Sequence, residues 1–261
     1  MSSDEYHVTS EIHQAINKDS AAKPSLSAEN VVSRFSFKYP LNIEYSHSDK
    51  NCGVRIDEDG DLIVCRKADK IQEEGIIEIE HSYSTTLALV GRQIWRGALL
   101  LGDFLLHHGP SFLQDHIVLE LGSGVGLTSI VAAMFATEVI CTVIYDNDVT
   151  EAFVNTLQRL LSTPPGKTVY VALEKRYVFT VADLDSVAPC YEYFLQCLQK
   201  AQERPAGSQW QVEQLPINFP QYFNYERVKE LVLWRIMSKC GYQCITGTYF
   251  PHGIITQKTT I

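Results

Sequence analysis

The sequence lacks an excess of positive charge. Its 31 Asp and Glu residues outnumber its 22 Lys and Arg residues, which leaves a formal net charge of −9 at neutral pH. Nucleic acids and anionic membranes attract clusters of cationic side chains, so the overall charge indicates neither partner. The chain also lacks an apolar run of about 20 residues, the length that crosses a bilayer, because Gly, Asp and His interrupt the longest runs. We therefore expect no membrane-spanning segment.

Cysteine and signal-peptide patterns are also missing. The seven cysteines are an odd number without framework spacing, and the N-terminal stretch "MSSDEYHVTSEIHQ" has no apolar core. These features predict a reducing, intracellular setting, in the nucleus or the cytoplasm. Cys240 and Cys244 lie near His252 but lack a second Cys pair, so no metal site is predicted.

What the sequence does contain is enough apolar residues for a sizeable core. An apolar content of 45% and a charged content of 20% are typical of a globular chain, and 261 residues suit one large domain with flanking segments. Residues 1–50 show no sustained period and are expected to be mostly disordered or loosely attached. The folded domain is expected at 51–237, followed by an irregular tail at 238–261.

The apolar periodicity predicts alternating strands and helices. A hairpin around Asp59-Gly60 and a strand at 75–83 come first, and a helix from about residue 90 is expected to close at Gly109-Pro110. Further elements are expected as strands at 116–120, 138–146, 167–176, 209–217 and 232–237, and helices at 127–136, 147–162 and 191–202. This order predicts an α/β, doubly wound sheet with helices on both faces.

Three alternating glycines mark the most informative stretch, "HIVLELGSGVGLTSIVAA". Gly122, Gly124 and Gly126 stand between a buried strand and a buried helix, where missing Cβ atoms let a ligand approach the backbone. Their spacing differs from the Gly-x-Gly-x-x-Gly of a dinucleotide loop. A tight turn alone requires only one such glycine. The pattern therefore predicts a cofactor pocket.

The stretch "VLELGSGVGLTSIVAA" resembles the first motif of S-adenosylmethionine-dependent methyltransferases of the seven-strand class. Together with "EIEHSYSTTLALVGRQIWRGALLLGDFLL" upstream and "VIYDNDVTEAFVNTLQRLL", "VALEKR" and "FNYERVKELVLWRI" downstream, it resembles the protein-lysine methyltransferases of that class, over about 59–237. The resemblance implies a Rossmann-like sheet of strand order 3-2-1-4-5-7-6. It also implies S-adenosylmethionine as cofactor and a protein substrate that carries a lysine.

The same resemblance implies which residues bind the cofactor, and it assigns no catalytic residue. A matching cofactor loop, which would wrap the methionine end and the ribose, is formed by Glu120, Gly122, Ser123, Gly124 and Gly126. Trp95 matches the family's upstream Trp beside the cofactor. A core Trp on an amphipathic helix is an equally good interpretation of Trp95, since Trp is usually well buried.

The chain departs from the family pattern near residues 142–143. "EVICT" matches the family's second strand up to the residue before its ribose-binding acid, and "VIYDND" matches the end of the fourth strand. The family's acid-x-x-Tyr becomes Thr142 to Tyr145, with Thr in place of the carboxylate. At about 30 residues per βαβ unit, roughly 60 residues or more are missing in between. A contracted sheet and a weakened or lost cofactor site are expected, since a charge-assisted hydrogen bond contributes about 1.5–3 kcal/mol.

Several alternatives stay open at this point. Asp146 follows Gly126 at about the spacing of a ribose-binding acid, but Asp-Asn-Asp before a helix favours an N-cap. We expect residues 138–145 in the second-strand position, with 169–173 beside the first strand. The chain is then a shortened lysine methyltransferase with an incomplete cofactor site, a non-catalytic interaction module, or an unstable product with exposed sheet edges.

Overall fold

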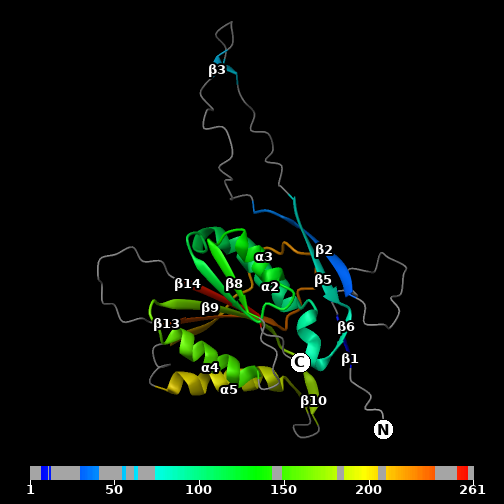
Figure 1. Cartoon of the computed structure of the whole chain (residues 1–261), viewed down its shortest axis with the longest axis vertical. Coiled ribbons are helices and arrows are strands. Elements are labelled where there is room, and N and C mark those ends of the chain that lie inside the picture. The colour runs from blue at the N-terminus through cyan, green and yellow to red at the C-terminus, as the bar shows by residue number, and fades with distance from the viewer. Residues whose placement is uncertain are drawn as a thin grey trace.

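The computed structural model places helices on both faces of one six-stranded sheet (Figure 1). The structure describes residues 7–10, 12, 30–40, 55–56, 62–63, 74–142, 149–180, 185–204, 210–238 and 252–257. The mixed α/β class expected from the alternating pattern is confirmed. No helix in these ranges is long and apolar enough to cross a membrane.

The strands and helices follow one another along the chain. They are β1 (His7–Thr9), β2 (Asn30–Lys38), β3 (Arg55–Ile56), β4 (Leu62–Ile63), β5 (Glu74–Ser82), β6 (Ser84–Thr86), the 3-10 helix η2 (Leu87–Arg92), α2 (Arg96–Phe112), β7 (Ile117–Leu121), α3 (Leu127–Ala133), β8 (Glu138–Thr142), α4 (Val149–Leu161), β9 (Lys167–Glu174), β10 (Val178–Thr180), β11 (Asp185–Val187), α5 (Pro189–Glu203), β12 (Trp210–Leu215), β13 (Leu231–Ser238) and β14 (His252–Gln257).

The central sheet has the order β12-β13-β9-β14-β7-β8. Strands β8, β7, β14 and β9 run parallel, whereas β13 is antiparallel to β9 and β12 is antiparallel to β13. Strand β8 lies beside β7 at the sheet edge, with Ile117 opposite Glu138, as expected for the second-strand position. The remainder of that predicted strand, 143–146, lies outside the described residues.

Strand β14 is the main difference from the sequence-based expectation. It lies between β7 and β9, pairing Ile255 with Glu120 on one side and with Tyr170 on the other. The predictions of an irregular tail and of direct contact between the first strand and 169–173 are therefore wrong here. Buried backbone groups require hydrogen-bond partners, and a central strand supplies them to both neighbours. A six-residue strand paired on both sides shows no polar alternation that would reveal it in the sequence.

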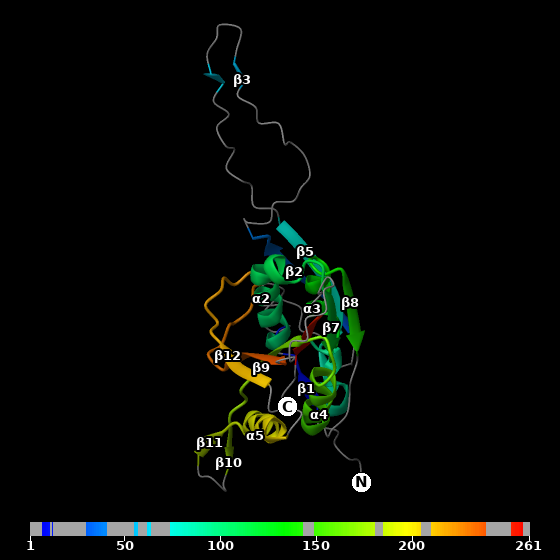
Figure 2. The ribbon, with the colours of Figure 1, turned by 90° about the vertical axis from the view of Figure 1, so that its left-hand side faces the viewer.

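Two apolar cores lie on opposite faces of the sheet (Figures 1 and 2). Helices α2 and α3 cover one face, and α4 and α5 cover the other. Strand β9 contributes to both cores in alternation, with Tyr170 and Ala172 in the first and Val169 and Val171 in the second. This alternation follows from the two-residue period of a strand, and it leaves residues 169–173 of β9 buried on both faces of the sheet.

The N-terminal segment contains more structure than its composition suggests. Residues 1–50 were expected to be mostly disordered, yet β1 and β2 lie within them. Strand β2 pairs antiparallel with β5, which places Phe35 opposite Ile77 and both side chains in the first core. Gly75 is opposite Phe37, whose ring would lie 2.3 Å from a Cβ at that position. The missed signal is the short alternation in "SRFSFK".

Helix α2 begins later and ends later than the sequence suggests. Residues 87–92 form η2, so α2 starts at Arg96, and it continues through Pro110 to Phe112 instead of closing there. Proline lacks an N–H and removes a single intrahelical bond, which the last turn tolerates. The Leu113 N–H still donates to the Gly109 carbonyl at 2.8 Å. The β10–β11 hairpin is a further element that the periodicity does not reveal.

Candidate functional site

The three glycines after β7 all adopt positive φ. Their φ values are 74° at Gly122, 54° at Gly124 and 84° at Gly126. Residues with a Cβ rarely adopt this conformation, so the turn from β7 into α3 requires glycine at each position. A Cβ added at Gly126 would meet nothing within 4 Å. The backbone of the loop is therefore open on that side, which is what close approach of a ligand requires.

The other two loop residues are engaged inside the protein. Ser123 is buried, and its carbonyl accepts a hydrogen bond from the Gly126 N–H at 2.8 Å. Glu120 is buried as well, and its carboxylate accepts a hydrogen bond from the Ser129 hydroxyl of α3. Glu120 thereby fastens α3 to β7 and fixes the span of the loop between them.

Burial raises the pKa of Glu120, while hydrogen bonds from Ser129 and Thr128 oppose that shift. The folded state therefore takes up a proton at higher pH than the unfolded chain does. The contribution of Glu120 to the free energy of unfolding is complete below the unfolded-state pKa of about 4.3 and is lost as the pH rises through the folded-state pKa. We expect Glu120→Gln, which removes the charge but keeps the size, to abolish that loss. Urea unfolding at a series of pH values from 4 to 8 measures it.

Glu138→Gln on the neighbouring strand β8 is the matched control, since Glu138 is exposed. Its free energy of unfolding should follow that of the native chain at every pH. If the Glu120→Gln and native curves also stay parallel, burial of the carboxyl has no effect on stability and the explanation is wrong.

Trp95 stands at the N-cap of α2, half-buried, rather than on a core-facing turn of the helix. Its indole Nε1 donates to the Val90 carbonyl at 3.0 Å, which fixes the ring. The guanidinium carbon of Arg176 lies 4.8 Å from the ring centroid, within the range of a cation–π contact. The Arg176 guanidinium therefore lies on a face of the Trp95 ring. Trp95 is half-buried and belongs to neither of the two apolar cores.

Arg96 joins the start of α2 to two other elements. Its guanidinium lies 3.1 Å from Glu174 at the end of β9, and both side chains are mostly buried. A second contact, at 3.6 Å, reaches Glu226 in the connection between β12 and β13. Gly97 allows the close approach, since a Cβ there would lie 3.3 Å from the Ala172 carbonyl oxygen. The sequence pattern gives no signal for these residues as a group, although Arg96 directly follows Trp95.

The carboxyl ends of the parallel strands bring these features to one edge of the sheet. Strands β7 and β9 both run parallel to β14, so the glycine loop and Glu174 lie at the same edge. The chain leaves β7 through α3 toward β8 and returns through α4 to β9, on the other side of β7. Ligands of open α/β sheets bind at such a reversal of strand order. Asp146 lies outside the described residues.

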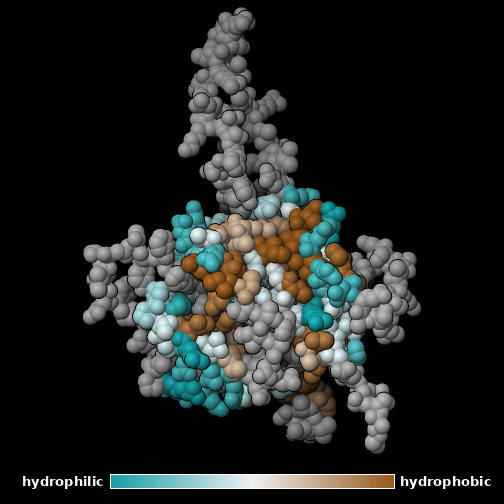
Figure 3. Space-filling model, in the orientation of Figure 1, coloured by the Kyte–Doolittle hydropathy of each residue, from teal (hydrophilic) through white to brown (hydrophobic). Residues whose placement is uncertain are grey.

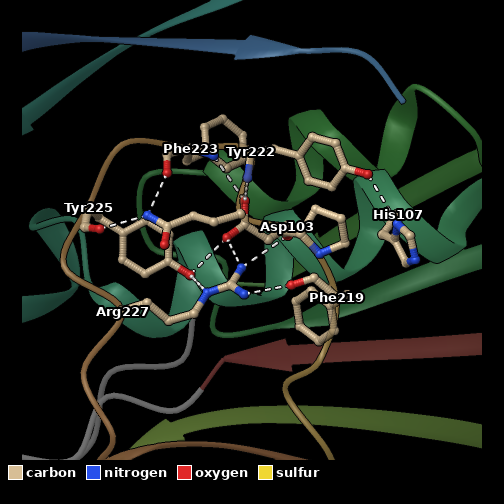
Figure 4. A network of polar contacts seen from close by, with 9 residues as sticks. Asp103, His107, Phe219, Tyr222, Phe223, Tyr225 and Arg227 are labelled. Atoms are coloured by element: carbon tan, nitrogen blue, oxygen red, sulfur yellow. Dashed lines mark hydrogen bonds and ion pairs between the residues drawn. The ribbon is translucent and has the colours of Figure 1, made fainter. Parts of the chain in front are cut away.

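Asp103 is the centre of a network of polar contacts that joins α2 to the β12–β13 connection (Figure 4). Its side chain is 0% exposed on α2, and it accepts hydrogen bonds from the backbone N–H groups of Tyr222 at 2.8 Å and Phe223 at 3.0 Å. The Tyr225 hydroxyl donates to it at 2.8 Å, and Arg227 forms an ion pair with it. Burial raises the pKa of Asp103, and these bonds lower it. The Asp103 network fixes the β12–β13 connection, which carries Glu226, against α2.

Metal-binding clusters are not found at this edge or elsewhere in the described ranges. No group of three or more His, Cys, Asp or Glu residues there is arranged to hold a metal ion.

Comparison with known proteins gives a consistent picture. The model of a family described as "Lysine methyltransferase" matches residues 72–143. Methyltransferase-like protein 22 of Mus musculus is 30% identical, over 70% of this chain and 73% of the mouse protein. Methyltransferase-like protein 22 of Homo sapiens is 29% identical, over 71% of each chain. The mouse alignment has 288 positions, whereas 70% of 261 residues is about 183, so about 105 positions hold no residue of this chain.

Proposed function

Because this chain belongs to the family of methyltransferase-like protein 22, a family of lysine methyltransferases, we propose that it binds S-adenosylmethionine at the loop after β7 and methylates a lysine of a protein substrate. The observation that carries the proposal is the run of positive φ values at Gly122, Gly124 and Gly126. At these three positions, two residues apart, the positive φ favours glycine over residues with a side chain. A backbone without side chains can lie directly against a ligand.

The residues present fit that cofactor. The open space beside Gly126 admits a ligand against the backbone, and Trp95 offers a half-buried aromatic face at the same edge of the sheet. Residues 122–126 and Trp95 would hold the cofactor, with Glu120 fixing the loop from behind. When bound, S-adenosylmethionine supplies a methyl group on a positively charged sulfur, and a neutral lysine amine accepts it. The role of the chain is to position the two and to exclude water.

We also propose that the sheet is a contracted form of the methyltransferase sheet. In the order 3-2-1-4-5-7-6, β8, β7, β14, β9, β13 and β12 would take positions 2, 1, 4, 5, 7 and 6. The family match ends at residue 143, directly after β8, and about 105 alignment positions lack a residue of this chain. Both observations support an internal segment missing near 142–143, with β14 taking the place of the fourth strand.

The contraction has a consequence for affinity. The family's ribose-binding acid would stand at residue 143, where this chain has Val. Loss of a charge-assisted hydrogen bond of about 1.5–3 kcal/mol corresponds to about 10- to 150-fold weaker binding. We expect the chain to bind S-adenosylmethionine more weakly than the longer relatives do.

Calorimetry with S-adenosylmethionine tests the proposal. We expect weak but saturable binding to the native chain and no detectable binding to Gly126→Val, because a β-branched residue cannot adopt a φ of 84° without strain. Val143→Asp should tighten binding about tenfold or more, since it supplies the missing carboxylate. Ala133→Val, on the exposed side of α3, is the matched control and should bind like the native chain.

Other outcomes separate the alternatives. A native chain that melts cooperatively but binds no S-adenosylmethionine would favour the non-catalytic interaction module. The absence of a cooperative melt would favour an unstable product. Equal binding by the native chain and Val143→Asp would contradict the assignment of the missing acid to residue 143.

A further inference from the structure

The β10–β11 hairpin exposes three consecutive large apolar residues. Tyr177 is 55% exposed, Val178 is 48% exposed and Phe179 is 67% exposed. Figure 2 shows the hairpin projecting at the lower left beyond α5, and Figure 3 shows brown atoms at the lower edge, where β10 lies in Figure 1. A contiguous group of exposed apolar residues is typical of a surface that binds a partner.

The hairpin contributes little to either core. Its pairing comprises only Val178 with Val187, Phe179 with Ser186 and Thr180 with Asp185. None of the residues in these pairs belongs to the two apolar cores. A two-stranded ribbon of this length is not stable by itself. A role in stability therefore does not explain why its apolar residues are retained at the surface.

The base of the hairpin is fixed at the edge that carries the glycine loop. The Lys175 N–H donates to the Glu230 carbonyl at 3.0 Å, and the Lys175 ammonium lies 4.7 Å from the ring centroid of Tyr191 in α5. Arg176, the next residue, contacts the face of Trp95 at 4.8 Å. The exposed triplet thus begins one residue beyond the side chain that contacts the proposed cofactor site.

The charge of the hairpin indicates the chemistry of its partner. Asp185 is exposed on β11, opposite Thr180. Glu192 is exposed at the start of α5. Aromatic faces attract ammonium and guanidinium groups, and carboxylates pair with them. The two cations at the base of the hairpin, Lys175 and Arg176, already face the rings of Tyr191 and Trp95. A segment that combines apolar with cationic side chains is therefore complementary to the remaining exposed rings and carboxylates.

We infer that the described part of the hairpin, residues 177–180 and 185–187, is the docking surface for the protein substrate, and that it binds a basic, lysine-bearing segment with apolar side chains at the edge of the sheet that carries the glycine loop. The inference rests on the proposed function, since it names the substrate-recognition element of the same site. Apolar side chains of the segment lie on Tyr177 and Phe179, and its cations face Asp185. Docking at this position brings a neighbouring lysine toward the edge where Trp95 lies.

Fluorescence anisotropy without cofactor tests the inference. The probes are labelled decapeptides of alternating lysine and leucine, or of alternating glutamate and leucine. We expect the native chain to bind the lysine peptide at least tenfold more tightly than the glutamate peptide. Phe179→Ser should weaken binding of the lysine peptide at least tenfold, and Asp185→Asn should weaken it about threefold to tenfold. Val32→Ser is the matched control, because Val32 is 66% exposed on β2, in a different sheet.

Equal binding of the lysine peptide by the native chain and Phe179→Ser, or equal loss in Val32→Ser, would overturn the inference. So would equal affinity for the two peptides. Sedimentation equilibrium tests whether the hairpin binds a second copy of the chain instead. Self-association of the native chain that Phe179→Ser abolishes would also overturn the inference. Failure of S-adenosylmethionine to bind, with hairpin-dependent peptide binding intact, would refute methyl transfer but leave the docking surface standing.

Discussion

Replacing Ile255 with proline should unfold the central sheet. Ile255 pairs with Glu120 of β7 and with Tyr170 of β9, so its backbone lies in the middle of a strand that has neighbours on both sides. Proline has no N–H to donate, and its ring displaces the adjoining strand. A buried acceptor left unsatisfied costs about 1–3 kcal/mol, and displacement of the strand adds to this. We expect the free energy of unfolding to fall by about 3 kcal/mol or more in urea titrations followed by circular dichroism.

Two control variants test whether the loss of stability comes from proline in the middle of β14, and not from a change of residue 255 or from proline elsewhere in the chain. Ile255→Val keeps the N–H and a β-branched side chain that suits a strand, so it should lower the free energy of unfolding much less than Ile255→Pro does. Thr259→Pro places the same ring two residues beyond β14 and should have little effect. A chain with Ile255→Pro that melts like the native protein would show that β14 contributes nothing to the sheet.

Removal of the Asp103 carboxylate should be comparably destabilising. Asp103→Ala leaves the Arg227 guanidinium and two backbone N–H groups without the acceptor that they share. Breaking a buried pair by removing one partner costs about 3–5 kcal/mol. Asp103→Asn should cost nearly as much, because the amide nitrogen then faces the Tyr225 hydroxyl and Arg227, which are donors. Urea unfolding of both variants measures the loss.

A double-mutant cycle measures how much of that loss comes from the ion pair between Asp103 and Arg227. Asp103→Asn combined with Arg227→Met should be less destabilising than the sum of the two single changes, because the single changes leave a charge unpaired. The exposed pair of Arg34 and Glu78, 3.8 Å apart, is the matched control, and Glu78→Gln should cost less than about 1 kcal/mol. Additive effects at Asp103 and Arg227 would contradict the proposed coupling.

Local sequence patterns predict the glycine loop well. The turn between β7 and α3 is built from neighbouring residues, and the positive φ of Gly122, Gly124 and Gly126 is a property that glycine confers on each position. The apolar runs on either side identify β7 and α3 for the same reason. The period of the apolar residues within a segment is sufficient to predict a helix or strand when that element depends on its own residues alone.

Long-range contacts explain what the sequence could not predict. Asp103 is 119 residues from Tyr222 and 124 residues from Arg227 along the chain. Nothing in the sequence pattern of α2 indicates that Asp103 forms hydrogen bonds with these two residues. Strand β14 is selected by two neighbours far away in the sequence rather than by its own period. Trp95 is similar, since its ring contacts Arg176 in the connection between β9 and β10.

The position of β14 also sets the order in which the protein can mature during translation. Ribosomes add about 5–20 residues per second, so the 83 residues from Glu174 to Gln257 take about 4–17 s to synthesise. Throughout that interval β7 and β9 have been made but lack the strand that separates them. The nascent chain therefore carries two unsatisfied strand edges, which chaperones can hold and other chains can capture. Folding of this protein is expected to be limited by the arrival of its last described strand.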